Sequence, residues 1–204
     1  MKKSFLFLSV FIILVGCTST VSYKLSRQYY IQTPRTIAVL PVGGVEAEAD
    51  GRYLMRTIVA EKLRLKGYKT LSLEEVDERF LTIGLSALEK MPPQEIADFF
   101  QADAILFIWI TEWDRDTLIT YASMDIAARF ELFSKGGVKL WRADYAIKES
   151  DIKLDRTQMK LAVLKAYEPK VQRLVDVVFN TLPHAPAEAM KKEDKSFFNW
   201  LPSK

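Results

Sequence analysis

The segment Ala104–Trp113 constrains the fold most, because nearly all of its residues are apolar (AILFIWITEW). Many of them are β-branched or aromatic, as is typical of strands. The segment lacks the strict polar alternation of a strand with one wet face. It therefore predicts the central strand of a sheet that is covered on both sides. We expect an α/β domain with helices on both faces of that sheet.

Two other apolar segments, 36–42 and 68–71, predict further strands. Between them, apolar residues at helical spacing predict a helix over about residues 50–66, with Gly67 as its C-terminal stop.

Two helix starts follow the second strand. Ser72 and Glu75 form a capping-box pattern, which predicts a helix that ends near Gly84. Pro92 and Pro93 predict a second start, since proline is well placed in a first turn.

The segment 120–147 changes to period-two alternation and predicts an antiparallel hairpin that turns at residues 134–137. An apolar stripe over 164–182 predicts a final helix, kinked or split at Pro169. The order of elements predicts a three-layer α/β sandwich with a mixed five-stranded sheet, strand order 2-1-3-4-5, helices on both faces and a C-terminal helix.

The N-terminus indicates a secretory signal peptide over residues 1–16: Lys2 and Lys3 precede an apolar run, and small residues precede Cys17. The run is shorter than the ~20 apolar residues that a membrane-spanning helix needs. Its ending, Leu14-Val15-Gly16-Cys17, resembles the lipobox of bacterial lipoproteins.

That resemblance implies cleavage between Gly16 and Cys17, and a diacylglycerol and an N-acyl chain on Cys17. It also implies a lipid anchor in a Gram-negative bacterium, and Thr18 in place of Asp favours the periplasmic face of the outer membrane. We expect 17–34 to be the lipidated cysteine and its tether, 35–183 the α/β domain, and 184–204 a flexible tail.

Charge and cysteine content exclude several classes of protein. Loss of residues 1–16 removes Lys2 and Lys3, and the formal net charge falls from +3 to +1. Such a chain lacks the basic surface of a nucleic-acid-binding protein. Cys17 is the only cysteine, so the domain must fold without an internal disulfide.

No arrangement of residues predicts catalysis, a cofactor or a metal. His184 is the only histidine and lies near the end of the chain, where a solvated loop residue is the simpler interpretation. Gly43-Gly44 lacks the spacing of a phosphate-binding loop and more simply lets the chain turn. The cluster of Glu112, Asp114 and Asp116 could bind a cation or act on a glycan, although a charged turn explains it better.

Four motifs resemble a family of bacterial lipoproteins of unknown function, typified by a neisserial surface-antigen candidate. The motifs are Ile37–Pro41, Gly84-Leu85 with the Pro92-Pro93 helix, Gln101–Ala104 and Gly137–Trp141. The resemblance spans about residues 36–147 and implies a fold similar to the amino-terminal domain of TolB and, more distantly, to the curli-secretion lipoprotein. It implies no catalytic residues.

We therefore expect a non-enzymatic subunit of an envelope transport or secretion complex that binds other envelope proteins, lipoproteins among them. The docking surface would be the hairpin edge or the groove beyond Trp113, with Asp114, Asp116 and Trp141 as candidate contacts. Two alternatives stay open. One is a cell-wall or glycan hydrolase that uses the acidic cluster. The other is an oligomeric pore, since the first hairpin strand is long enough to cross an outer membrane.

Overall fold

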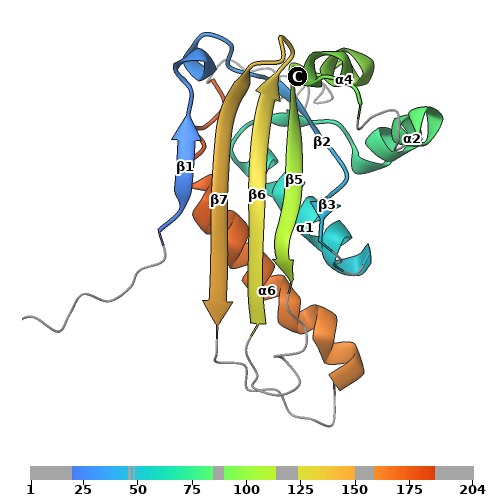
Figure 1. Ribbon diagram of the computed structural model, residues 1–204, viewed down its shortest axis with the longest axis vertical. Helices are drawn as coiled ribbons and strands as arrows, with labels where there is room; N and C mark the ends of the chain where they lie inside the picture. Colours follow the sequence, from blue (N-terminus) through green and yellow to red (C-terminus); the bar gives the residue numbers. More distant parts are fainter. Residues whose placement is uncertain are drawn as a thin grey trace, which may run out of the picture.

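The computed structural model describes residues 20–45, 47, 49–84, 90–113, 124–149 and 159–186 (Figure 1). In chain order the elements are β1 (Ser22–Leu25), the 3-10 helix η1 (Arg27–Tyr30), β2 (Thr36–Val39), β3 (Gly43–Gly44), α1 (Ala49–Leu65), β4 (Lys69–Thr70), α2 (Leu73–Ile83), α4 (Pro93–Phe100), β5 (Ala104–Trp113), β6 (Met124–Ser134), β7 (Lys139–Glu149) and α6 (Met159–Phe179).

One mixed seven-stranded sheet forms the centre of the domain, with the order β1-β7-β6-β5-β2-β4 and β3 paired to β5. β2 is parallel to β4 and β5, and β3 is parallel to β5, whereas each pairing along β1-β7-β6-β5 is antiparallel. The prediction of a mixed α/β sheet is confirmed. Its strand count and order differ in detail, because β1 adds an outer strand beside β7 and β3 adds a short one beside β5.

Helices lie on both faces of the sheet, but they cover them unequally (Figure 1). On one face α1 and α6 enclose the larger core, together with side chains of β2, β5, β6 and β7. On the other face α2 and α4 enclose a smaller core around Val76, Ile96, Phe100 and Ile105. The antiparallel half of that second face has no helix over it among the described residues.

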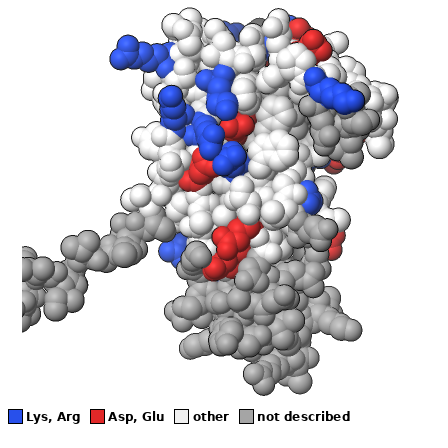
Figure 2. All heavy atoms as spheres, in the orientation of Figure 1, with Lys and Arg blue, Asp and Glu red and all other residues white. Residues whose placement is uncertain are grey.

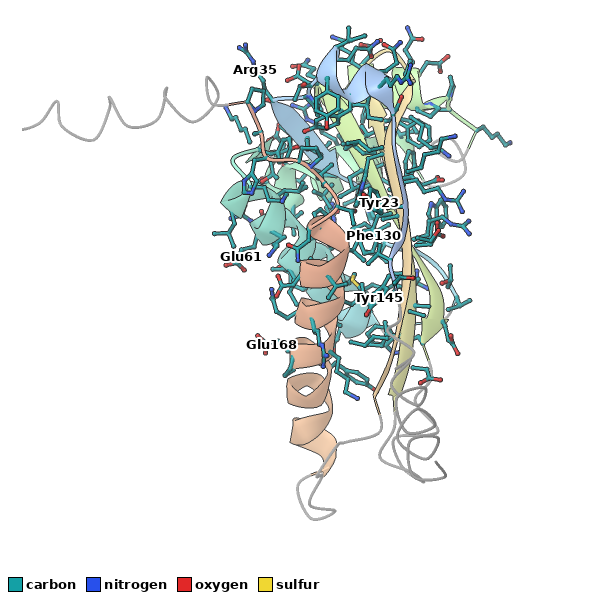
Figure 3. The ribbon with its side chains drawn as sticks, turned by 90° about the vertical axis from the view of Figure 1, so that its left-hand side faces the viewer. Tyr23, Arg35, Glu61, Phe130, Tyr145 and Glu168 are labelled. Atoms are coloured by element: carbon teal, nitrogen blue, oxygen red, sulfur yellow. The ribbon has the colours of Figure 1, made fainter. Side chains whose placement is uncertain are left out.

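The alternating pattern of β6 explains how the hairpin packs. Ile126, Phe130 and Leu132 are fully buried and point toward α6, which presents a matching apolar stripe. Figure 3 shows Phe130 and Tyr145 on this side of the sheet, and the Phe130 ring lies 5.5 Å from that of Phe179. The apolar hairpin face that a pore would turn toward lipid is thus covered by the last helix of the same chain.

Several local predictions are confirmed by backbone geometry. Ser72 caps α2, and its Oγ accepts a hydrogen bond from the Glu75 N–H at 3.0 Å. Pro93 stands in the first turn of α4. Of the two outcomes predicted at Pro169, a kink or a split, the split is not found, because α6 runs through Pro169 as one helix, and Pro169 is exposed.

The segment expected to be a free tether up to Pro34 is mostly part of the domain, which corrects that prediction. Ser22–Leu25 pairs with β7, and the Ser26 N–H donates to the Leu140 carbonyl at 2.8 Å. Tyr29 is 1% exposed, and its hydroxyl bonds to that of Tyr68. The domain therefore begins at about residue 20.

The C-terminal boundary also moves outward. Tyr68 donates a hydrogen bond from its hydroxyl to the Pro183 carbonyl at 2.8 Å, and the Ala185 N–H donates to the Lys66 carbonyl at 2.9 Å. Ala185 is buried, so the domain reaches beyond residue 183. The rest of the predicted tail, from residue 187, lies outside the described residues.

Candidate docking surface

The outward side of β5, β6, β7 and β1 forms a sheet surface that no described helix covers, which we call the open face. Figure 1 looks directly onto it, with α6 behind the strands. Monomeric proteins usually cover or solvate such a face with polar side chains. Here the open face has an aromatic part on β5 and a charged part on β6, β7 and β1.

The aromatic part is built around Trp109, whose side chain is 40% exposed. Its ring stacks on that of Phe107, with centroids 6.4 Å apart and an interplanar angle of 7°. Phe107 in turn meets the edge of Phe133 at 5.7 Å. The three rings hold one another in place, so the exposed indole is supported by packing.

The neighbouring strand β3 leaves room for this indole. Gly43 pairs with Trp109, and a Cβ on residue 43 would lie 2.5 Å from Cζ3 of the ring. Gly44 has φ 104° and packs against the Ile110 carbonyl, a geometry that side-chain-bearing residues rarely adopt. The two glycines therefore serve the packing beneath Trp109, as well as the turn that the sequence predicted.

The charged part is a ladder across β6 and β7. Arg129 stands opposite Asp144, and its Nε donates to Oδ1 at 2.7 Å. Arg142 donates from Nε to Oδ2 of Asp144 at 2.8 Å, and its Nη1 lies 3.6 Å from Glu131. Lys139 bonds Glu131 at 2.7 Å and lies 5.1 Å from the centroid of the Phe133 ring.

Positive charge dominates the outer layer of this ladder. The side chains of Arg129 and Arg142 are each 40% exposed, whereas Asp144 is 33% and Glu131 only 16% exposed. With Lys24 of β1 and Lys139, the ladder has a formal net charge of +2. Figure 2 shows Lys and Arg side chains gathered over this part of the face, beside an uncharged area over β5.

Electrostatic coupling ties the ladder together. Burial raises the pKa of Asp144, but the hydrogen bonds and charges of Arg142 and Arg129 outweigh it and leave that pKa below its ordinary value. The hydrogen bond to Asp144 raises the pKa of Arg142 further. The carboxylate is thus held in its charged form, and it orients both guanidinium groups on the surface.

The structure buries both tryptophans that the sequence proposed as docking contacts. Trp141 is fully buried, donates from Nε1 to Thr181 Oγ1 at 3.0 Å and packs on Phe179 at 5.3 Å. Trp113 is 9% exposed and packs on Tyr167 of α6 at 5.2 Å. Both point into the larger core, so neither indole is available at the surface.

Of the remaining candidates, Glu112 and His184 lie among the described residues. Gly16, Cys17, Asp114 and Asp116 lie outside the described residues, whereas His184 is exposed after α6.

Sequence reasoning missed Trp109 and Gly43, because the apolar run of β5 predicts cover on both faces. The odd positions Phe107, Trp109 and Thr111 share one side of the strand, and only the aromatic residues among them could have signalled a surface.

Two arginines lie near the carboxyl end of β2, the end of a parallel strand at which open α/β sheets commonly bind ligands. Arg56 is 4% exposed, donates to the Val39 carbonyl from Nε and Nη2, and pairs with Asp77 at 2.5 Å. Arg52 donates to the carbonyls of Val42 and Val45 at 2.8 Å. These guanidinium groups satisfy main-chain carbonyls, so their role here is structural.

Other perturbed or unpaired groups lie in the cores. Burial raises the pKa of Tyr29 and of Tyr68, and burial with the charge of Lys62 lowers the pKa of Lys66. Trp113 Nε1 is buried without a hydrogen-bond partner among the residues that the structure describes.

Within the described ranges no three His, Cys, Asp or Glu side chains are grouped as a metal site would require. Among the described helices, none combines the length and apolarity needed to cross a membrane.

Comparison with known proteins gives a consistent picture. A family model described as "Putative lipoprotein GNA1162-like" matches residues 26–192. A curated relative, "Putative lipoprotein NMB1124/NMB1162" of Neisseria meningitidis, is 26% identical over 120 residues, which is 57% of this chain. The match spans 56% of the relative, so it covers little more than half of that protein's length.

Two solved structures share the fold. The crystal structure of lipoprotein GNA1162 from N. meningitidis has a TM-score of 0.51 and 22% identity, over 69% of this chain and 99% of that one. The PelC dodecamer from Paraburkholderia phytofirmans has a TM-score of 0.55 and 16% identity, over 83% of this chain and 100% of that one. At these identities the likeness concerns the fold alone.

Proposed function

Because the chain belongs to the GNA1162-like lipoprotein family, we propose that it is a lipid-anchored, non-catalytic subunit of an oligomeric transport or secretion complex in the bacterial envelope. The open face carries this proposal. It presents an exposed tryptophan supported by packing, beside two arginines fixed by Asp144. Trp and Arg are the residues most enriched at the energetic centres of protein interfaces.

The proposed anchor is Cys17, acylated after cleavage of residues 1–16. Since β1 begins at Ser22, the chain between Cys17 and the sheet can extend to only about 17 Å. The domain then stays next to the bilayer, whereas a tether up to Pro34 would have let it reach far from the membrane. We propose that the anchor lies in the periplasmic leaflet of the outer membrane, because Thr18 rather than an aspartate follows Cys17.

Self-assembly is the form of complex that the comparisons favour. The PelC structure from P. phytofirmans, which shares this fold, is a dodecamer. A chain with an uncovered sheet face can cover it by associating with further copies, as most soluble oligomers are built from identical subunits. The open face would then be buried between subunits.

The test is the mass of the intact lipoprotein. The full chain, expressed with its own leader and extracted in mild detergent, is expected to elute as an oligomer by light scattering. Trp109→Ala should shift it toward smaller species, and Leu65→Ala, at an exposed residue on α1 outside the open face, should not. A strictly monomeric wild type that captures no envelope protein under mild crosslinking would refute the proposal.

Cys17→Ala tests the anchor separately. This variant should keep its leader and carry no acyl chain by mass spectrometry, and globomycin should block processing of the wild type. A wild-type chain that is processed in the presence of globomycin, or that carries no acyl group when mature, would refute the lipid anchor while the oligomer stands.

A further inference from the structure

A second charged surface lies on the outer side of α2 and α4. α2 has four carboxylates and one arginine, and α4 has two carboxylates and no cation. Of these, Asp77 and Glu75 pair with arginines of the same chain, and Asp98 lies 3.3 Å from Lys135. Glu74, Glu78 and Glu95 are exposed, and the structure gives them no ion pair within the ranges it describes.

Glu74 and Glu78 share one helix face with Leu81, at spacings of four and three residues. Leu81 is 81% exposed, which is unusual for a leucine on a helix that packs its other side into a core. Two like charges four residues apart destabilise an isolated helix. The stripe Glu74–Glu78–Leu81 thus combines an apolar group with two uncompensated carboxylates.

The composition of this stripe is complementary to that of the open face. The open face has an exposed indole, Trp109, beside the guanidinium groups of Arg129 and Arg142. Lys24, at the outer end of the ladder, is exposed and has no ion pair within the described part of the chain. An exposed leucine between carboxylates therefore matches an exposed tryptophan beside cations.

Resting on the oligomer proposed above, we propose that copies of this chain associate head to tail. The open face of one copy covers the Glu74–Glu78–Leu81 stripe of the next. Leu81 then packs on Trp109 of the neighbour, and Glu74 and Glu78 meet the exposed cations of its ladder. Burial of the two apolar groups supplies affinity, and the charges fix the register.

The placement of the two surfaces supports this arrangement. In Figure 1 the open face points toward the viewer and α2 lies on the right flank, so the two surfaces are different parts of the molecule. A contact between two different surfaces is heterologous, and its repetition produces a ring when the rotation closes. A symmetric contact of two open faces would instead oppose cation to cation, which electrostatics disfavours.

A charge swap tests the contact. The first variant, Lys24→Glu with Arg142→Glu, makes the open face acidic, and the second, Glu74→Lys with Glu78→Lys, makes the stripe basic. Each variant alone should lose self-association by roughly tenfold or more, since like charges then meet at every contact. An equimolar mixture should assemble again, because the two variants can alternate. Contacts between the two reversed surfaces then alternate with contacts between the two native ones, and opposite charges meet at each.

Matched controls keep the result interpretable. Lys69→Glu and Glu61→Lys reverse exposed charges outside both surfaces and should assemble like the wild type. Lys24→Glu alone disturbs no ion pair of the described chain, and it should still weaken assembly if Arg142→Glu harms the fold. If the wild type is an oligomer and both swap variants assemble equally well alone, the head-to-tail contact is refuted while the oligomer stands. A monomeric wild type refutes both.

Discussion

The indole of Trp109 lies against the backbone of Gly43, so closely that a Cβ on residue 43 would stand 2.5 Å from Cζ3 of the ring. The two residues are partners in the β3–β5 pairing. Glycine at 43 therefore determines where the exposed tryptophan lies, and it links a motif near the start of the domain to the open face.

Gly43→Ala is expected to displace the Trp109 ring. Because that ring is 40% exposed, it can swing outward, and the free energy of unfolding should fall by only about 1 kcal/mol. Self-association should weaken markedly, because the indole no longer rests on Phe107. Tryptophan fluorescence and light scattering measure the two effects.

The matched control is Gly136→Ala, at a glycine in the turn before β7. A Cβ there would meet only Ser134 Oγ at 3.7 Å and Gln32 Oε1 at 3.9 Å, which are ordinary contacts, so both readouts should match the wild type. If Gly43→Ala assembles as well as Gly136→Ala does, the packing of Trp109 is unimportant for docking.

Trp109→Ala and Trp141→Ala should separate docking from stability. Trp141 is fully buried between Phe130 and Phe179, and its removal should cost about 3–5 kcal/mol in urea unfolding. Trp109→Ala should cost no more than about 1 kcal/mol, because the side chain is already partly in water. Equal losses of stability would show that Trp109 belongs to the core.

The charged ladder predicts a specific dependence of stability on pH. The pKa of Asp144 is below its ordinary value in the folded protein, so the folded state binds its proton less readily than the unfolded chain does. Its stabilising contribution is complete above the ordinary carboxyl pKa and is lost as the pH falls through the lower, folded value.

Urea titrations from about pH 6 down to pH 3 measure this effect in the wild type and in Asp144→Asn. The wild type should lose more stability than the variant over that range, and added salt should reduce the difference between them. Parallel losses would show that the arginines do not depress the pKa of Asp144.

The buried tyrosine pair gives a fourth prediction. Tyr68 donates to the Pro183 carbonyl, which leaves its oxygen to accept from the Tyr29 hydroxyl. Tyr68→Phe removes both bonds and should cost about 2–3 kcal/mol, whereas Tyr29→Phe removes one and should cost about 1 kcal/mol. Thermal unfolding of the two variants checks this order, and the reverse order would contradict the hydrogen-bond directions.

The sequence predicted those parts of the fold that depend on local pattern. The helix starts at Ser72 and Pro93 depend on a few adjacent residues, and the β6 alternation follows from one buried face, so each could be found without a structure. Pairing of β1 with β7 could not. It joins residues such as Ser22 and Asp144 that are far apart in the chain, and the four residues of β1 have no apolar alternation strong enough to mark a strand.

The sequence could predict that the hairpin region would dock a partner, but not which residues would form the surface. The hairpin edge was expected to dock a partner, but β1 pairs with β7 and occupies that edge. Trp113 and Trp141 belong to apolar strands whose two sides cannot be told apart by composition. Which side of β5 remains open depends on where α2 and α4 stop, and this is a property of the tertiary structure. The role of Trp109 therefore became visible only with the sheet assembled.

The β1–β7 pairing has a consequence for how the molecule is made. Ser22–Leu25 is synthesised early, yet its hydrogen-bonding partners at residues 141–144 follow only when about two thirds of the chain exists. During synthesis the first strand therefore stays without its partner until β7 has been made. A chain cut before residue 141 therefore lacks the partner that closes this edge of the sheet.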